Sequence, residues 1–170
     1  MKIRNGFVSN SSSSSFLVAF PSRPKSAKDV KDMVFGSKRK IKHPFMEDSS
    51  KSTQVLSEVI WRLIEKQIPN NRNLFLSRIN NLFIEETYKD NGKYIIAKEN
   101  SVSDWGNDVD WEAYEADVKK AVINFIEEHK GSYFYYFEFA DDNGKPEGYG
   151  SILEHGDTFK SLPHLVSSNH

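Results

Sequence analysis

Apolar residues recur every three or four positions through the middle of the chain, a spacing that predicts amphipathic helices. The clearest helix begins near Asp108 or Asp110 and ends at Lys130-Gly131, with acidic residues in its first turn, where they complement the helix dipole. A short helix is expected over Ala27–Phe35, with Ser26 as its N-cap and Gly36 at its end. A third helix is expected from the spacing of Leu56, Val59, Ile60, Leu63 and Ile64, and it ends at Pro69-Asn70-Asn71. A fourth helix is expected from the spacing of Phe75, Ile79, Leu82 and Phe83, and it ends at Asp90-Asn91-Gly92.

Other segments have the pattern of strands. Phe16–Phe20 is an uninterrupted apolar run closed by Pro21 and Pro24, as expected of a buried strand. Along Ser132–Ala140 the period changes to two, so that every second residue is aromatic and shares one face. The remaining expected elements are a short strand over Tyr94–Ala97, a turn over Asp141–Gly144 and a return strand over Gly148–Glu154.

Helices in the middle and strands near both ends predict a single α+β domain over residues 1–170. Its sheet is expected to be small and antiparallel or mixed, covered by three main central helices that lie on one side. Residues 1–15 form a Ser- and Asn-rich N-terminal segment, and residues 37–52 are expected to be a basic loop. The edge of such an aromatic sheet could pair with a second copy, which makes a homodimer one expected assembly.

Composition narrows the class of protein. The chain has no cysteine, which excludes disulfides, thiolate metal sites and a cysteine nucleophile. No apolar run approaches the roughly 20 residues that span a bilayer, and residues 1–16 lack the apolar core of a signal peptide. We therefore expect a cytoplasmic protein without a membrane partner, located in the host cytoplasm if a phage encodes it.

Charge is unevenly distributed along the chain. Residues 1–100 carry 18 Lys and Arg against 10 Asp and Glu, whereas residues 101–170 carry 5 against 14. The densest basic cluster is formed by Lys38, Arg39, Lys40 and Lys42. Such clusters bind nucleic-acid phosphates or acidic protein surfaces, although a solvated loop is the simpler interpretation and no nucleic-acid-binding motif surrounds this one.

Five consecutive serines near the N-terminus are the first candidate site. Hydroxyls and turn amides together can hold phosphate, which suggests an anion-binding loop. A serine tract is more often a flexible linker, but apolar residues on both sides favour order here. The residues of this candidate phosphate site are Asn10, Ser11, Ser12, Ser13, Ser14 and Ser15.

The second candidate site is the C-terminal segment, which holds three of the five histidines. His155, Asp157 and His164 could form an acid–base pair, and His155, His164 and His170 could bind a metal. Their spacing matches no compact zinc motif, and surface histidines are the alternative interpretation. The sequence lacks the common phosphate-binding, hydrolase and metalloprotease motifs, so it requires no cofactor and leaves enzymatic activity uncertain, with a non-enzyme favoured.

Both ends of the chain resemble a family of small, mostly uncharacterised proteins of tailed phages and bacteria. The matching residues are Arg4–Asn10 with the five serines and Phe16, then Phe137–Phe139, Asp141–Gly144, Glu154–Asp157, Phe159, Pro163 and His164. They cover about a third of the chain, and the helical middle is not diagnostic. The resemblance implies an accessory protein that modulates host processes, loosely including host transcription during heat shock, but it supplies no mechanism.

Three functional hypotheses follow. The first is a phage-type accessory protein that binds a host macromolecule, most simply a protein of the transcription or defence machinery. The second is an enzyme or phosphate-binding protein in which Ser11–Ser15 meet His155, Asp157 and His164 in one polar pocket at a sheet edge. The third is nucleic-acid binding through residues 38–42, which requires affinity to fall steeply with salt.

Overall fold

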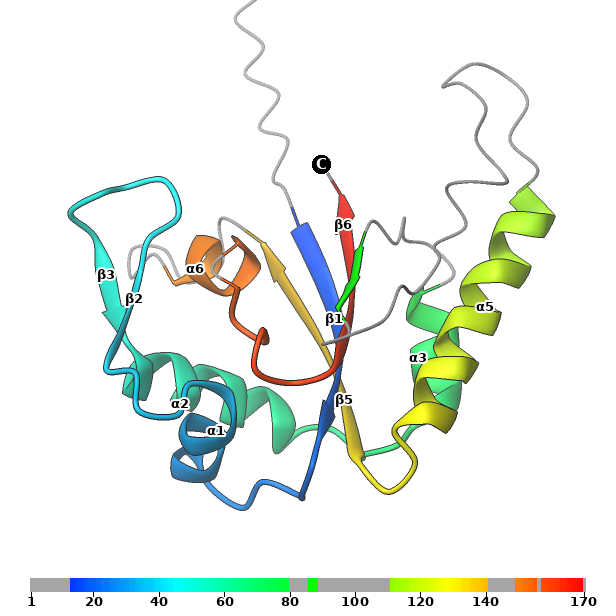
Figure 1. Cartoon of the computed structure of the whole chain (residues 1–170), viewed down its shortest axis with the longest axis horizontal. Helices are drawn as coiled ribbons and strands as arrows, with labels where there is room; N and C mark the ends of the chain where they lie inside the picture. The colour runs from blue at the N-terminus through cyan, green and yellow to red at the C-terminus, as the bar shows by residue number, and fades with distance from the viewer. Residues whose placement is uncertain (1–12, 80–85, 89–110, 141–148, 156, 170) are drawn as a thin grey trace, which may run out of the picture.

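Figure 1 shows a computed structural model of the chain, which describes residues 13–79, 86–88, 111–140, 149–155 and 157–169. The strands are β1 (Ser13–Phe20), β2 (Lys40–Lys42), β3 (Ser50–Ser52), β4 (Glu86–Tyr88), β5 (Tyr133–Ala140) and β6 (His164–Asn169). The helices are α1 (Ala27–Val34), α2 (Thr53–Ile64), α3 (Arg72–Ile79), α5 (Trp111–Glu128) and α6 (Gly150–His155). This mixture of helices and antiparallel strands confirms the α+β class. No helix in the described ranges is both long enough and apolar enough to cross a bilayer.

The main sheet contains four antiparallel strands in the order β4-β6-β1-β5. β1 lies at its centre, where Phe16 is opposite Phe137 of β5 on one side and Val166 of β6 on the other. Segments from near the two ends of the sequence are therefore neighbours in the sheet (Figure 1). The expected antiparallel sheet built from such segments is confirmed.

Helices cover both faces of this sheet. Phe16, Val18 and Phe20 pack on one face with core residues of α1, α2 and α6. Leu17 and Ala19 pack on the other face with residues of α3 and α5. Figure 1 shows these two groups of helices on opposite sides of the strands. The expectation of helices on one side only is wrong, and the uninterrupted apolar run of β1 is the signal, because a strand buried on both faces has no polar face.

Aromatic side chains of β5 are buried in the core on one face of the sheet, as the alternating pattern predicts. Tyr135, Phe137 and Phe139 of β5 are buried together on one face. The Phe137 ring stacks on Phe159, with ring centroids 4.9 Å apart. Phe134 and Tyr136, which point to the opposite face, are also buried, so β5 is apolar on both sides.

Local signals explain where the predicted helices begin and end. The Ser26 side chain accepts a hydrogen bond from the Asp29 amide at the start of α1 (3.1 Å), as an N-cap does. Gly36 and Gly131 follow α1 and α5 with φ of 56° and 98°, values that favour glycine and stop a helix. Asn70 follows α2 with φ of 62°. The helices expected over these three regions are confirmed.

Three expectations for individual elements are wrong. The return strand expected over Gly148–Glu154 is instead the short helix α6. The helix expected to continue toward Asp90 gives way to β4, whose Thr87 is opposite Leu165 of β6. The loop expected over residues 37–52 contains the antiparallel strands β2 and β3, because Ile41 packs inward against the core and anchors them. The strand over Tyr94–Ala97 and the turn over Asp141–Gly144 lie outside the described residues.

The outer edge of β5 is occupied by the segment between α2 and α3. The Gln67 side chain donates to the Tyr136 carbonyl (2.7 Å) and accepts from the Tyr136 amide (3.0 Å). Asn70 likewise makes two hydrogen bonds to the Phe134 backbone. Its own backbone N–H donates to the Phe134 carbonyl (3.1 Å), and its Oδ1 accepts from the Phe134 amide (2.8 Å). The backbone groups of Phe134 and Tyr136 are therefore not available to pair with a second copy, and the homodimer stays a prediction.

Candidate functional site

The described part of the serine tract is a strand and not a loop. Ser13, Ser14 and Ser15 open β1 and pair with Ala140, Phe139 and Glu138 of β5. Ser14 and Ser15 are buried, and Ser15 Oγ accepts a hydrogen bond from the Tyr136 hydroxyl (2.9 Å). Burial raises the pKa of that hydroxyl above its usual value of 10.0, so it remains a donor at neutral pH. Asn10, Ser11 and Ser12 lie outside the described residues.

The sheet register separates the described serines from His164. β1 and β6 are neighbours, as the hypothesis required, but the register places Ser14 opposite Ser168 and Val18 opposite His164. Four residues along a strand separate these positions by about 13 Å. Ser15 moreover bonds Tyr136 on one face of the sheet, whereas the His164 ring contacts Phe16 on the other. The register therefore does not place Ser13–Ser15 beside His164, and the part of the hypothesis that involves Ser11, Ser12 and His155 stays a prediction.

His164 has a structural environment. Its side chain is buried against the rings of Phe16 and Phe159, with centroids 6.2 and 6.4 Å away. The Leu162 carbonyl lies 2.8 Å from Nδ1, so Nδ1 carries the proton and donates it. Burial lowers the pKa of His164 below its ordinary value of 6.5, although the Leu162 carbonyl and the Asp157 charge act in the opposite direction. The imidazole is therefore neutral at pH 7.

This burial has a measurable consequence for stability. The folded pKa of His164 lies below the unfolded value, so the unfolded chain binds the proton first as the pH falls through 6.5. The contribution of His164 is complete above pH 6.5 and is lost below it. We expect the free energy of unfolding, measured with urea between pH 8 and 5, to fall less in His164→Asn than in the unmodified chain. Asn retains a donor for Leu162 and does not titrate, so equal falls would contradict a buried neutral His164.

His155 belongs to a different neighbourhood. Its Nε2 lies 3.4 Å from a carboxylate oxygen of Glu154, whose side chain is fully buried. The ring of Phe45 packs edge-on against His155, with centroids 5.0 Å apart, and also contacts His43 at 6.1 Å. Asp157 points elsewhere: it is exposed and lies 3.4 Å from Lys160. His155 joins α6 to the turn between β2 and β3.

The described residues contain no group of three His, Asp or Glu side chains that could hold a metal ion. His155 and His164 therefore do not share a metal site with another such described side chain. The third expected ligand, His170, is outside the described residues.

Residues 38–52 form a projecting hairpin, which we call the basic hairpin: Lys38 and Arg39, then β2, β3 and the turn between the two strands (Figure 1). Its base is fixed to the start of α2, where the fully buried Thr53 donates from Oγ1 to the Lys38 carbonyl (2.8 Å) and from N–H to the Arg39 carbonyl (3.0 Å). Its turn is held by the Phe45 amide, which donates to Nδ1 of the buried His43 (3.2 Å). These hydrogen bonds fix the conformation of the hairpin at its base and at its turn.

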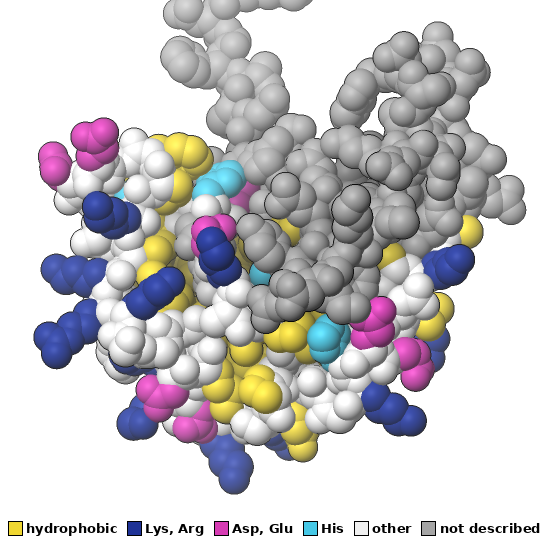
Figure 2. Space-filling view, viewed as in Figure 1, with side chains coloured by type: hydrophobic (Ala, Val, Ile, Leu, Met, Phe, Trp, Pro, Cys, Tyr) yellow, Lys and Arg dark blue, Asp and Glu magenta, His cyan; other side chains and the backbone are white. Residues whose placement is uncertain are grey.

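The outer surface of the basic hairpin combines positive charge with an apolar tip. Lys40 and Lys42 share the face opposite Ile41, and both are exposed, as are Lys38 and Arg39. Figure 2 shows Lys and Arg side chains along the left edge, over β2 and β3. At the tip, Phe45 and Met46 are 67% and 51% exposed. The sequence identified the cations but not this apolar pair, whose signal was two large apolar residues after Pro44 inside a polar segment.

Comparisons with models of protein families, with curated proteins and with solved structures find no match to this chain. The resemblance at the two chain ends therefore stays a prediction.

Proposed function

We propose that this chain is a binding protein that docks the basic hairpin onto an acidic surface of a partner protein. The observation that carries the proposal is the tip of the hairpin, where Phe45 is two-thirds exposed beside a row of cations on a fixed backbone. Exposed aromatic residues are the usual anchors of protein interfaces, and surrounding charges select and steer the partner. The resemblance at the chain ends further suggests a host protein of the transcription or defence machinery.

A partner protein fits this surface better than a nucleic acid does. Phe45 and Met46 are exposed beside Glu47 and Asp48 in the same turn, and a phosphate backbone offers no apolar surface to cover the Phe45 and Met46 side chains. Figure 2 shows Asp and Glu side chains at the upper left, above the cations of the hairpin. Mixed charge around an apolar pair is typical of the rim and centre of a protein interface. The enzyme alternative has less support, because the sheet register places Ser14 opposite Ser168 and not beside His164.

Two variants test the hairpin. Phe45→Ala should weaken binding of the partner about 30-fold, the effect of removing an interface anchor. Lys40→Gln with Lys42→Gln should weaken it about tenfold at low salt and less at high salt, because screening removes the steering charge. Ile68→Ala and Lys66→Gln are the matched controls, since Ile68 is 75% exposed and Lys66 is also exposed, both outside the hairpin. All four variants should melt near the temperature of the unmodified chain.

The measurement is quantitative capture from nuclease-treated and untreated bacterial lysate, followed by titration of the captured protein. A protein retained by the controls and lost by both hairpin variants supports the proposal. Retention that depends on the lysines but disappears after nuclease treatment would instead assign the hairpin to nucleic acid. Equal retention by Phe45→Ala and Ile68→Ala would remove the hairpin as the docking surface.

A further inference from the structure

A cavity of about 290 Å³ lies at the end of α2 distant from the basic hairpin. It is formed where the loop after β1, the end of α2 and the start of β5 meet, and it is lined by Arg23, Pro24, Lys25, Trp61, Ile64, Glu65, Gln67 and Tyr135. This volume is close to the lower end of small-molecule sites, which span about 300–1,000 Å³. None of these residues belongs to the candidate sites that the sequence suggested.

The cavity has apolar walls and a tyrosine hydroxyl among its polar lining groups. Trp61, Ile64 and Pro24 supply the apolar walls, and both Ile64 and Pro24 are buried. Tyr135 is only 1% exposed, and its hydroxyl interacts with the Arg23 guanidinium. Burial raises the pKa of this hydroxyl above 10.0 even though the positive charge of Arg23 acts to lower it. Tyr135 therefore remains a neutral donor beside a cation.

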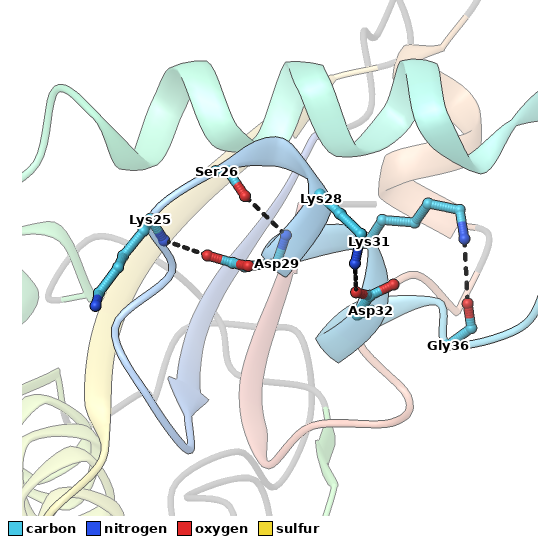
Figure 3. A network of polar contacts seen from close by, with 7 residues as sticks. All are labelled: Lys25, Ser26, Lys28, Asp29, Lys31, Asp32 and Gly36. Carbon is cyan, nitrogen blue, oxygen red and sulfur yellow. Dashed lines mark hydrogen bonds and ion pairs between the residues drawn. The ribbon is translucent and has the colours of Figure 1, made fainter.

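Two walls of the cavity are held in place by hydrogen bonds. Gln67 uses its amide group on the Tyr136 backbone at the edge of β5, which fixes its position. The loop that carries Arg23 and Lys25 is fixed at the start of α1, where the Lys25 amide donates to Asp29 Oδ2 (2.8 Å). Figure 3 shows this capping arrangement, with the Lys25 side chain directed away from the Asp29 carboxylate. A preformed site of this kind needs little ordering when a ligand binds.

The charges around the cavity favour an anion. Arg23 and Lys25 contribute two positive charges and Glu65 one negative charge. Within the described ranges, none of the ion pairs involves Arg23 or Lys25, so neither is neutralised by a carboxylate there. The planar guanidinium of Arg23 suits a carboxylate or a phosphate, which it can bind through two N–H groups.

We propose that this cavity binds a small molecule with a flat apolar body and one anionic group, a carboxylate or a phosphate. The flat body lies against Trp61 and Ile64, and the anionic group meets Arg23 and the Tyr135 hydroxyl. The cavity and the basic hairpin lie at opposite ends of α2, so the cavity shares no residue with the proposed docking surface.

The test uses four probes that share one two-ring body: 1-naphthoate, 1-naphthyl phosphate, 1-naphthalenemethanol and 1-naphthylmethylamine. Each is titrated into the full chain while the indole N–H resonance of Trp61 is followed by NMR, assigned with Trp61→Phe. We expect at least one anionic probe to bind about tenfold more tightly than the neutral alcohol, as a charge-assisted hydrogen bond allows. The naphthoate and phosphate arms show which anion the site prefers.

Arg23→Gln identifies the residue that selects the anion. It should weaken the anionic probe about tenfold and leave the alcohol unchanged. Arg62→Gln is the matched control, because Arg62 is an exposed arginine of α2 that does not line the cavity, and it should change neither probe. The proposal is overturned if the alcohol or the amine binds as tightly as the anions, if Arg23→Gln has no effect, or if no probe shifts Trp61 at about 10 mM.

Discussion

Replacing Phe159 by alanine should lower the free energy of unfolding by about 3–5 kcal/mol, the usual cost of removing a fully buried aromatic ring. Phe159 is 1% exposed and lies in the turn between α6 and β6. Its ring centroid is 4.9 Å from that of Phe137 and 5.3 Å from that of Phe16. One ring therefore joins the α6–β6 connection to strands β1 and β5. Its loss leaves a cavity among aromatic groups that cannot collapse easily.

The measurement is urea unfolding followed by circular dichroism. Phe159→Leu is the matched control, since leucine keeps much of the buried volume and should cost well under half as much. Phe45→Ala removes the same side chain from an exposed position and should cost less than about 1 kcal/mol. A loss below about 1 kcal/mol for Phe159→Ala would show that the α6–β6 connection does not pack on the sheet as described.

Replacing Asn70 by alanine should lower the free energy of unfolding by about 2–3 kcal/mol, with two separable causes. Asn70 has φ of 62°, a conformation that asparagine tolerates and alanine does not. Its Oδ1 also accepts the Phe134 amide at 2.8 Å on the outer edge of β5. Alanine loses the acceptor and adds backbone strain.

Two further substitutions separate these causes. Asn70→Gly relieves the strain but lacks the acceptor, and it should cost about half as much as alanine. Asn70→Asp keeps an acceptor and tolerates the positive φ, so it should remain close to the unmodified chain. Urea unfolding gives the free energy of unfolding of the three variants. Equal losses for alanine and glycine would mean that the backbone conformation contributes nothing.

Elements with strong local signals were predictable from the sequence. The helix α1 has Ser26 at its start and Gly36 after its end, and both act as the sequence indicates. Strand β5 alternates aromatic residues with period two, and its Tyr135, Phe137 and Phe139 face is buried as expected. In these elements local propensity and tertiary packing favour the same structure.

The helix α6 shows why other elements were not predictable. The alternation of Tyr149, Ser151 and Leu153 also fits a strand, and a six-residue segment is too short for periodicity to distinguish the two. Tertiary contacts leave no place for a return strand beside β5. One edge of β5 pairs with β1, and Gln67 and Asn70 bond backbone groups along its other edge. Adjacent Ile152 and Leu153 are both fully buried, which a half-exposed strand would not allow.

The candidate site was predictable only in part. The cations of the basic hairpin stand out as a cluster in the sequence, whereas the exposure of Phe45 depends on the turn that His43 holds. The serines and histidines were unusual in composition, but register and face decide whether such residues meet, and neither is written in the local sequence. The cavity beside Tyr135 joins three segments distant in the chain, and no local pattern marks it.

The position of β1 between β5 and β6 has a consequence for how the protein is made. Phe16 pairs with Val166, roughly 150 positions later, so the central strand is synthesised long before either neighbour exists, and contacts of such separation form slowly. Until those neighbours are synthesised, the apolar residues of β1 stay exposed, and chaperones or other nascent chains can bind them. The earliest strand of the sheet is thus among the last to find its partners.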